Sequence, residues 1–210
     1  MSRQATSSRS LLRLCCAALA ALAIGTLAAC AGRSAALSDI RYDLGPQQEA
    51  APASALLPPL KVLEVSAPVT LDNDGILYRL NGDSQRSGRY ADSRWTMSPA
   101  RLLTQRLRTA LASRATVLSG ADAVRAPMLK VELTEFEQVF DTSTQSTGVV
   151  AARATLMQGG KVIAQRAFVA RAPASTPDAA GGVAALRAAS DDFAGQIGAW
   201  VGAQAFAGTP

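Results

Sequence analysis

The sequence predicts an α+β fold of a single domain, in which a mostly antiparallel sheet carries two helices packed on one face. Three observations lead to this prediction. Runs of alternating apolar and polar residues recur between Gly- and Pro-rich turns, as half-buried strands require. Two longer stretches, 98–114 and 183–205, carry apolar residues at helical spacing. The order β-β-β-α-β-β-β-β-α has no internal repeat and suits helices gathered on one face of a sheet.

Three strands are expected before the first helix. Residues 40–44 alternate apolar and polar side chains, and a Gly-Pro pair ends this run. Residues 60–65 are mostly apolar on both faces, which is typical of a central strand. Residues 76–80 place Ile, Tyr and Leu on one face between two turns. Segment 88–95 is expected to be short and extended, outside the main strands.

The first helix is the clearest element. Ser98 suits the N-cap position, and a proline follows it at the favoured first helical position. Leu103, Leu107 and Leu111 then recur at helical spacing. Arginines lie largely off this stripe, at Arg101, Arg106, Arg108 and Arg114. The pattern predicts an amphipathic helix that buries its leucines against the sheet.

The second half of the chain continues with strands. A short strand is expected at 116–118, and a longer one begins at Leu129. The alternation slips near Glu135, which indicates a bulge or a change of face. Residues 149–157 and 162–169 flank a Gly-Gly pair and therefore predict a β-hairpin.

Residues 1–29 have the layout of a secretory signal peptide. Arg3, Arg9 and Arg13 form a basic region without acidic residues, and an apolar stretch follows at 14–29. This stretch is shorter than the roughly 20 residues that a spanning helix needs. We therefore expect residues 1–29 to be removed during export.

Cys30 directly follows this segment and is expected to carry a lipid. Leu27-Ala28-Ala29-Cys30 resembles a lipobox, and both other cysteines lie within the signal peptide. Fatty acyl chains such as palmitate would then hold the chain on a membrane. An ordinary signal peptide followed by a chance cysteine is the alternative. Residues 30–38 would form the anchor and spacer, and 39–207 the folded domain.

The residues after Cys30 also bear on localisation and on partners. Ala31 stands where inner-membrane lipoproteins of enteric bacteria carry Asp, which favours the outer membrane, with the domain facing the periplasm. Without the signal peptide the 21 basic residues fall to 18, and against 16 acidic residues the net charge is +2. This small charge does not indicate nucleic-acid binding.

The composition excludes several kinds of catalytic and metal site. The chain has no histidine, so it has neither a Ser-His-Asp nor a Cys-His catalytic group, and no His-ligated metal. Phosphate-binding glycine motifs are absent as well. A serine hydrolase that uses a Ser-Lys dyad remains a minor alternative, although no S-x-x-K motif occurs. We expect no cofactor, no metal and no enzymatic activity.

The acidic clusters are expected to be surface features. Residues 72–75 (Asp-Asn-Asp-Gly) resemble the start of a calcium loop but lack the remaining ligands, so a turn is favoured. Glu135 and Glu137 would share one face of a strand, where a solvated face is favoured over an acid–base pair. The same interpretation applies to Asp191 and Asp192 on the second helix.

Tyr90 and Trp95 are candidate partner contacts. Both aromatic residues fall in the polar segment 88–98 between a turn and a helix start. Aromatic residues in a loop can anchor an interface. They can equally close one end of the hydrophobic core, and this second interpretation is favoured.

Several short motifs occur in an order and spacing known from one family. They are Tyr42-Asp43-Leu44-Gly45, Leu77-Tyr78-Arg79, Tyr90, Arg94-Trp95, Ser98-Pro99-Ala100, Leu102-Leu103, Leu107, Leu129-Lys130-Val131-Glu132-Leu133 and Phe136-Glu137. Together they resemble the ABC-type transport auxiliary lipoproteins (PqiC-like) over roughly residues 40–205. Asp43 departs from the apolar or aromatic residue more usual there.

This resemblance implies a non-catalytic accessory role. Such lipoproteins accompany an ABC transporter whose substrate-binding component carries MCE domains and which moves lipids between the inner and outer membranes. An MCE-domain protein would be the partner, the lipid anchor would provide the membrane contact, and a homo-oligomer is a further form that the chain would be able to take. The alternative is an envelope-assembly or cell-wall regulator lipoprotein that binds an outer-membrane protein or a synthase.

Overall fold

The computed structural model describes residues 39–47, 57–80 and 86–206. The predicted signal peptide and Cys30 lie outside the described residues. The chain divides into two compact units, residues 1–39 and 40–210, and the fold below is that of the second unit.

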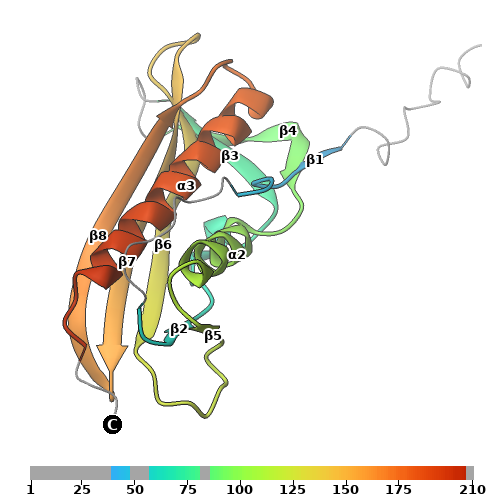
Figure 1. The fold of residues 1–210 in the computed structure, drawn as a ribbon. Helices are drawn as coiled ribbons and strands as arrows, with labels where there is room; N and C mark the ends of the chain where they lie inside the picture. Colours follow the sequence, from blue (N-terminus) through green and yellow to red (C-terminus); the bar gives the residue numbers. More distant parts are fainter. Residues whose placement is uncertain (1–38, 48–56, 81–85, 207–210) are drawn as a thin grey trace, which may run out of the picture. The chain divides into compact units, whose positions relative to one another are not determined.

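Eight strands form one sheet around a central long strand. The strands are β1 (Ile40–Tyr42), β2 (Leu60–Val62), β3 (Gly75–Leu80), β4 (Ser87–Trp95), β5 (Val117–Leu118), β6 (Met128–Phe140), β7 (Ser146–Gln158) and β8 (Lys161–Pro173). One edge of β6 pairs with β2 near its start and with β3 near its end, while its other edge pairs with β7. The order β1-β4-β3-β6-β7-β8 therefore runs across the wider end of the sheet (Figure 1).

The sheet is mixed. The three long strands β6, β7 and β8 form an antiparallel meander, and β3 and β4 form an antiparallel hairpin. The pairs β1–β4, β2–β5, β2–β6 and β3–β6 are parallel. Parallel pairing needs a crossover connection, and the segment containing the first helix supplies one between β3 and β6. The α+β class is confirmed, and the parallel pairs add to the antiparallel framework expected from the sequence.

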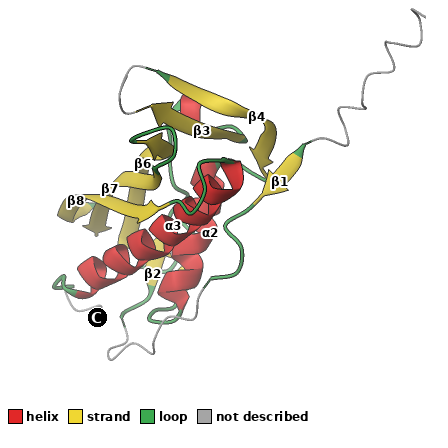
Figure 2. Ribbon diagram, turned by 90° about the horizontal axis from the view of Figure 1, so that it is seen from above, coloured by secondary structure: helices red, strands yellow, loops and turns green. Residues whose placement is uncertain are grey.

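Both helices cover the same face of the sheet, as predicted. Helix α3 (Ala179–Gly202) packs along β7, β8 and β6. Helix α2 (Pro99–Ala112) lies beside α3 and over β2, as two perpendicular views show (Figures 1 and 2). A single turn of 3-10 helix, η3 (Val69–Leu71), precedes β3. The largest fully buried side chains come from both layers and include Trp95, Phe136, Phe193, Leu103, Leu107, Leu129 and Leu186.

Some element boundaries differ from the predicted ones. Segment 88–95 belongs to the nine-residue strand β4, because its pairing with β3 and β1 overrides a polar composition. Helix α3 begins at Ala179, four residues before its expected start. Its N-cap is Asp178, whose carboxylate accepts a hydrogen bond of 2.8 Å from the Gly181 amide. Glycines in the first turn hide this start from a pattern of apolar residues.

Other local predictions are confirmed. The ladder between β6 and β7 shifts register between Leu133 and Glu135, where a bulge is expected. Gly159 and Gly160 join β7 to β8 with φ of +57° and +79°, the backbone that a two-residue turn with Gly-Gly adopts. Ser98 directly precedes α2, but its side chain makes no capping hydrogen bond.

Candidate functional site

The face of the sheet opposite α2 and α3 is not covered by a helix of the described residues. The strand registers place one row of side chains across it: Arg89 on β4, Leu77 on β3, Glu137 on β6, Val149 on β7 and Arg171 on β8. Neighbouring strands lie about 4.8 Å apart, so the row spans roughly 19 Å. We call this surface the open face, and the row gives it a cation at each end and a carboxylate at its centre.

Two adjoining depressions hollow the open face. Each has a volume of about 400 Å³, and both are lined by Arg79, Glu135 and Glu137. The apolar part of the lining of the first includes Leu71 and Leu77. Arg89 also lines the first, and Arg171 lines the second. A lining that combines charged and apolar residues suits recognition of a polar or amphiphilic partner.

An ion pair forms the wall between these depressions. Arg79 Nε lies 2.6 Å from Glu137 Oε1, and its Nη2 lies 3.3 Å from Oε2. The Glu137 side chain is only 7% exposed, whereas that of Arg79 is 36% exposed. The hydrogen bond to Glu137, together with its negative charge, raises the pKa of Arg79. The expectation that Glu137 lies on a solvated face was therefore wrong, because the parallel pairing of β3 with β6 buries it under an arginine.

Three charged side chains on the open face remain available to a partner. Arg89, Glu135 and Arg171 make no side-chain hydrogen bond or ion pair with the part of the chain that the structure describes, and all three are exposed. Long side chains of this kind can pair with an incoming surface without first breaking an internal contact. The open face is thus suited to binding.

Tyr90 lies on the helix-covered side of the sheet. Its hydroxyl donates a hydrogen bond of 2.8 Å to Gln138 Oε1, and Gln138 Nε2 donates one of 2.8 Å to Ser146 Oγ. The ring packs 5.2 Å from that of Tyr78, centroid to centroid. Burial, with the nearby charge of Asp178, raises the pKa of Tyr90 to about 12.

Trp95 is fully buried. Its ring packs edge-on against Phe136, with centroids 5.6 Å apart, and has no accessible surface. The structure therefore supports the core alternative for Trp95 and corrects its candidacy as a surface anchor. Tyr90 is half-buried and satisfied by Gln138, so the two aromatics do not form one exposed patch.

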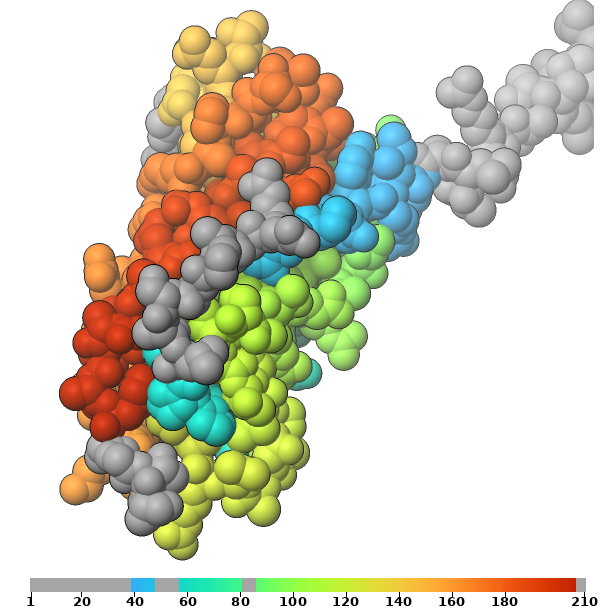
Figure 3. All heavy atoms as spheres, viewed as in Figure 1, coloured from blue at the N-terminus to red at the C-terminus, as the bar shows by residue number. Residues whose placement is uncertain are grey.

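A second feature fixes the segment that leads from the N-terminal region into the domain. Arg106 on α2 is buried and donates to the carbonyl oxygens of Leu44 and Gly45. Its Nη1 lies 2.9 Å from Asp191 Oδ1 on α3, although this contact is not aligned as a hydrogen bond. Asp191 thus belongs to a part-buried ion pair, which corrects the expectation of a solvated face. Figure 3 shows the described residues after β1, 43–47, lying against the helices.

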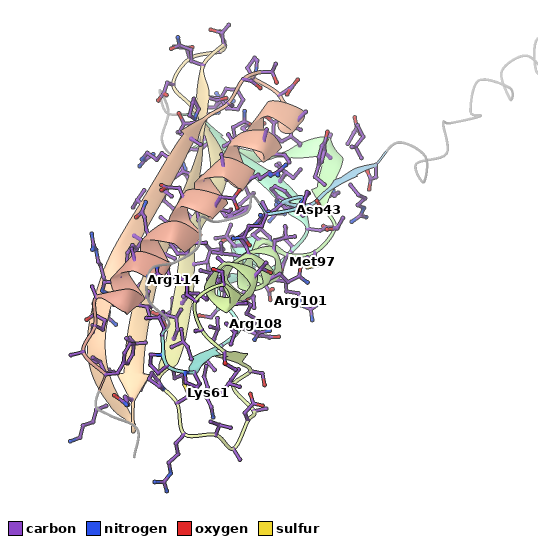
Figure 4. All side chains as sticks on the ribbon, viewed as in Figure 1. Asp43, Lys61, Met97, Arg101, Arg108 and Arg114 are labelled. Carbon is purple, nitrogen blue, oxygen red and sulfur yellow. The ribbon has the colours of Figure 1, made fainter. Side chains whose placement is uncertain are left out.

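Arginines surround α2 on several sides. Arg101 and Arg108 extend on the side of α2 away from α3, whereas Arg114 lies between the two helices (Figure 4). Arg108 donates to the carbonyl oxygen of Val62 at 3.0 Å. A smaller depression of about 300 Å³, whose lining includes Asp43, adjoins this helix. The arginines of α2 therefore include side chains that hydrogen-bond to neighbouring backbone as well as side chains that face solvent.

Residues 72–75 form the turn that the sequence favours. Asn73 Oδ1 accepts a hydrogen bond from the Gly75 amide at 3.0 Å, and Asp74 pairs with Arg41 at 2.7 Å. Among the described residues no group of three or more metal-ligating side chains comes together. The described helices include none that is long and apolar enough to cross a membrane.

Sequence patterns alone missed the open-face array. Arg79, Arg89 and Arg171 each sit at alternating positions within strands, which marks them as exposed but does not bring them together. Their common face depends on the parallel β3–β6 pairing, and this pairing has no signal in a single sequence. The one sequence signal that could have suggested these three arginines is the alternation of polar and apolar residues within each strand.

Known proteins share this fold and, over most of the chain, its sequence signature. The sequence model described as the ABC-type transport auxiliary lipoprotein component matches residues 42–198. No curated protein matches by sequence. The crystal structure of XCC0632 from Xanthomonas campestris superposes with a TM-score of 0.68 at 19% identity, covering 77% of this chain and 94% of that one.

A second solved structure, that of an uncharacterized protein, gives a TM-score of 0.62 at 17% identity, covering 78% of this chain and 99% of that one. At these identities the two structures support the shared fold alone. The match of the family's sequence model extends over most of the domain, from β1 into α3. The chain belongs to the ABC-type transport auxiliary lipoprotein family.

Proposed function

We propose that this protein is a lipid-anchored, non-catalytic accessory component of an MCE-type ABC system that moves lipids between the inner and outer membranes. The observation that carries the proposal is the family match over residues 42–198. The family description supplies the transport role, while the MCE partner and the lipid cargo are part of the proposal. A lipid on Cys30 would tether the domain to the outer membrane, facing the periplasm.

The open face is the proposed docking surface for the MCE-domain partner. It is uncovered by the described helices, and its row of side chains ends in Arg89 and Arg171, which form no ion pair within 39–47, 57–80 and 86–206. Exposed charges steer association and set the orientation of a complex more than they set its affinity. We therefore expect an acidic or mixed-charge patch on the partner.

Photocrosslinking in cells tests the partner. A photoreactive residue is placed at position 89 or 171 on the open face and, as the matched control, at the exposed arginine position 101 on α2. We expect capture of an MCE-domain protein from positions 89 and 171 and not from 101. Capture of a cell-wall synthase or an outer-membrane barrel would instead support the envelope-regulator function. Crosslinks between copies of the chain would show a homo-oligomer.

The anchor is tested separately. Cys30→Ala removes the thiol that accepts the lipid, so labelling with radioactive palmitate should be lost and the protein should leave the membrane fraction. Retention of label by the variant would contradict lipidation at Cys30. Density-gradient separation of the two membranes, applied to the unmodified protein, would test the outer-membrane assignment.

A further inference from the structure

Strand β8 forms one edge of the sheet. It runs for 13 residues, Lys161–Pro173, and pairs only with β7. No other described segment lies along its outer side, and Figure 1 shows it at the margin of the domain. In an antiparallel pair, every second residue of an edge strand directs its N–H and C=O groups away from the sheet. Such an edge is a template for a further strand.

The side chains of this edge are basic and partly apolar. β8 carries Lys161, Arg166 and Arg171, all exposed, and no acidic residue. Val162 and Val169 are 58% and 49% exposed, and they make up two of the five large hydrophobic residues exposed on the described domain.

The position of Arg166 is partly fixed. Its guanidinium carbon lies 5.0 Å from the centre of the Phe168 ring, on the same strand. Phe168 is itself buried against Phe193 and Trp200 of α3. This stacking already restricts the rotamers of Arg166 in the free protein. Less side-chain entropy is therefore lost when a carboxylate of a partner pairs with its guanidinium.

We infer that the outer edge of β8 binds an extended acidic segment of a partner protein, which adds to the sheet as a further strand. Main-chain hydrogen bonds would supply affinity, and carboxylates facing Arg166 and Arg171 would supply specificity. Apolar side chains of the same segment would cover Val162 and Val169.

Charge argues against a second copy as the occupant. Two β8 edges in one ladder would bring together six cations and no anions, and like charges facing each other across strands are destabilising. Basic residues on an edge strand are a known protection against self-pairing. Here they leave the edge compatible with acidic segments.

Hydrogen–deuterium exchange on the mature, lipidated protein in detergent micelles tests the inference. The probes are two capped peptides that differ only in their charges, Thr-Val-Glu-Val-Thr-Thr-Val-Glu-Val-Thr and its lysine counterpart. Their charged residues are five positions apart, as Arg166 and Arg171 are, so one charge lies on each face of the added strand. The acidic peptide should slow amide exchange along 161–173, and the lysine peptide should not. Protection by both peptides alike, by neither, or at another segment alone would overturn the inference.

A charge swap sharpens the test. The double variant Arg166→Glu/Arg171→Glu should weaken binding of the acidic peptide by roughly tenfold, since two attractive cross-strand pairs become repulsive. It should also bind the lysine peptide. The matched control is Arg101→Glu/Arg125→Glu, which makes the same change of charge at exposed positions away from β8 and should leave binding unchanged. An equal loss in both variants, or dimerisation through β8, would count against an acidic partner strand.

Discussion

Arg106 Nη1 on α2 lies 2.9 Å from Asp191 Oδ1 on α3, and this pair joins the two helices beneath the segment that enters the domain. The same guanidinium donates to the carbonyl oxygens of Leu44 and Gly45. Burial lowers the pKa of Arg106, while the negative charge of Asp191 acts in the opposite direction. One arginine thus ties both helices to the segment that follows β1.

Replacing this arginine should destabilise the domain. Arg106→Met removes the cation but keeps much of the side-chain volume, and it leaves Asp191 and the carbonyl oxygen of Leu44 without a donor. We expect the free energy of unfolding to fall by about 2–4 kcal/mol, measured by urea denaturation. Arg101→Met, at an exposed position on the same helix, should change it by less than about 0.5 kcal/mol. Equal effects of the two variants would contradict the role of the buried pair.

Two glycines offer opposite outcomes for the same substitution. A Cβ atom at Gly148 on β7 would lie 2.6 Å from backbone atoms of Ala185 and Leu186 on α3, whereas one at Gly195 on α3 would meet nothing within 4 Å. Gly148→Ala should therefore push α3 off the sheet and cost about 1–3 kcal/mol. Gly195→Ala should stabilise the helix by about 0.5–1 kcal/mol. Thermal unfolding of both variants measures the difference, and stabilisation by Gly148→Ala would show that the close helix–sheet contact is absent.

The Tyr90 hydroxyl should lose its proton at a higher pH than an ordinary tyrosine, and its contribution to the free energy of unfolding should depend on pH. Its pKa is raised to about 12 in the folded protein, against about 10 when unfolded, so folding favours the protonated phenol. The resulting stabilisation is present below pH 10 and is lost as the pH rises toward 12. Ultraviolet difference spectra should show one tyrosine ionising with a pKa near 12, and Tyr90→Phe should remove this step. If the ionisation near pH 12 were still seen in Tyr90→Phe, it would belong to another tyrosine.

The phenol also has a structural role. Tyr90→Phe leaves the buried Gln138 Oε1 without its donor, at an expected cost of about 1–2 kcal/mol at pH 7. Chemical denaturation at pH 7 measures this cost. Because the hydrogen bond and the shifted pKa arise from one environment, unchanged stability together with an unchanged titration would contradict the described position of Tyr90.

The two ion pairs of β6 differ in burial and should differ in energy. Glu137→Gln removes the buried carboxylate that holds Arg79, and we expect a loss of about 1–2 kcal/mol. Glu132→Gln removes the exposed partner of Lys130, which lies 2.9 Å away, and should cost less than about 0.5 kcal/mol. Urea denaturation at low and high salt tests both variants, because only the exposed pair should be screened strongly. A larger loss for Glu132→Gln would contradict the burial of Glu137.

Prediction from the sequence succeeded where the determining interactions are local. The N-terminal end of α2, the Gly-Gly turn between β7 and β8, and the bulge near Glu135 follow from backbone preferences and side-chain alternation within a few residues. The start of α3 was harder to place. Its first turn contains Gly181 and Gly182, and a Cβ atom at Gly182 would lie 2.0 Å from Gln138 Oε1 on β6. These glycines serve a contact between distant segments and not a local turn.

The candidate site shows the same division. The alternation of apolar and polar residues placed Glu137 on one face of a strand, but it did not reveal which strand would lie beside it. Its burial comes from Arg79, 58 residues earlier in the chain, and from the parallel pairing that brings them together. For Trp95, the polar segment left an interface and a core position both open, with the core favoured, and the tertiary structure places its side chain in the core.

The sequence by itself predicts an export signal with a lipid site at Cys30, and it determined the class of the fold, the two helices and the absence of histidine chemistry. These features depend on composition and on short-range periodicity, which one chain displays directly. Tertiary structure alone decided the parallel pairings, the open face with its row from Arg89 to Arg171, and the exposed basic edge of β8. Each of these requires segments far apart in the chain to meet, and the pairing energy that selects them arises only when the whole sheet is assembled.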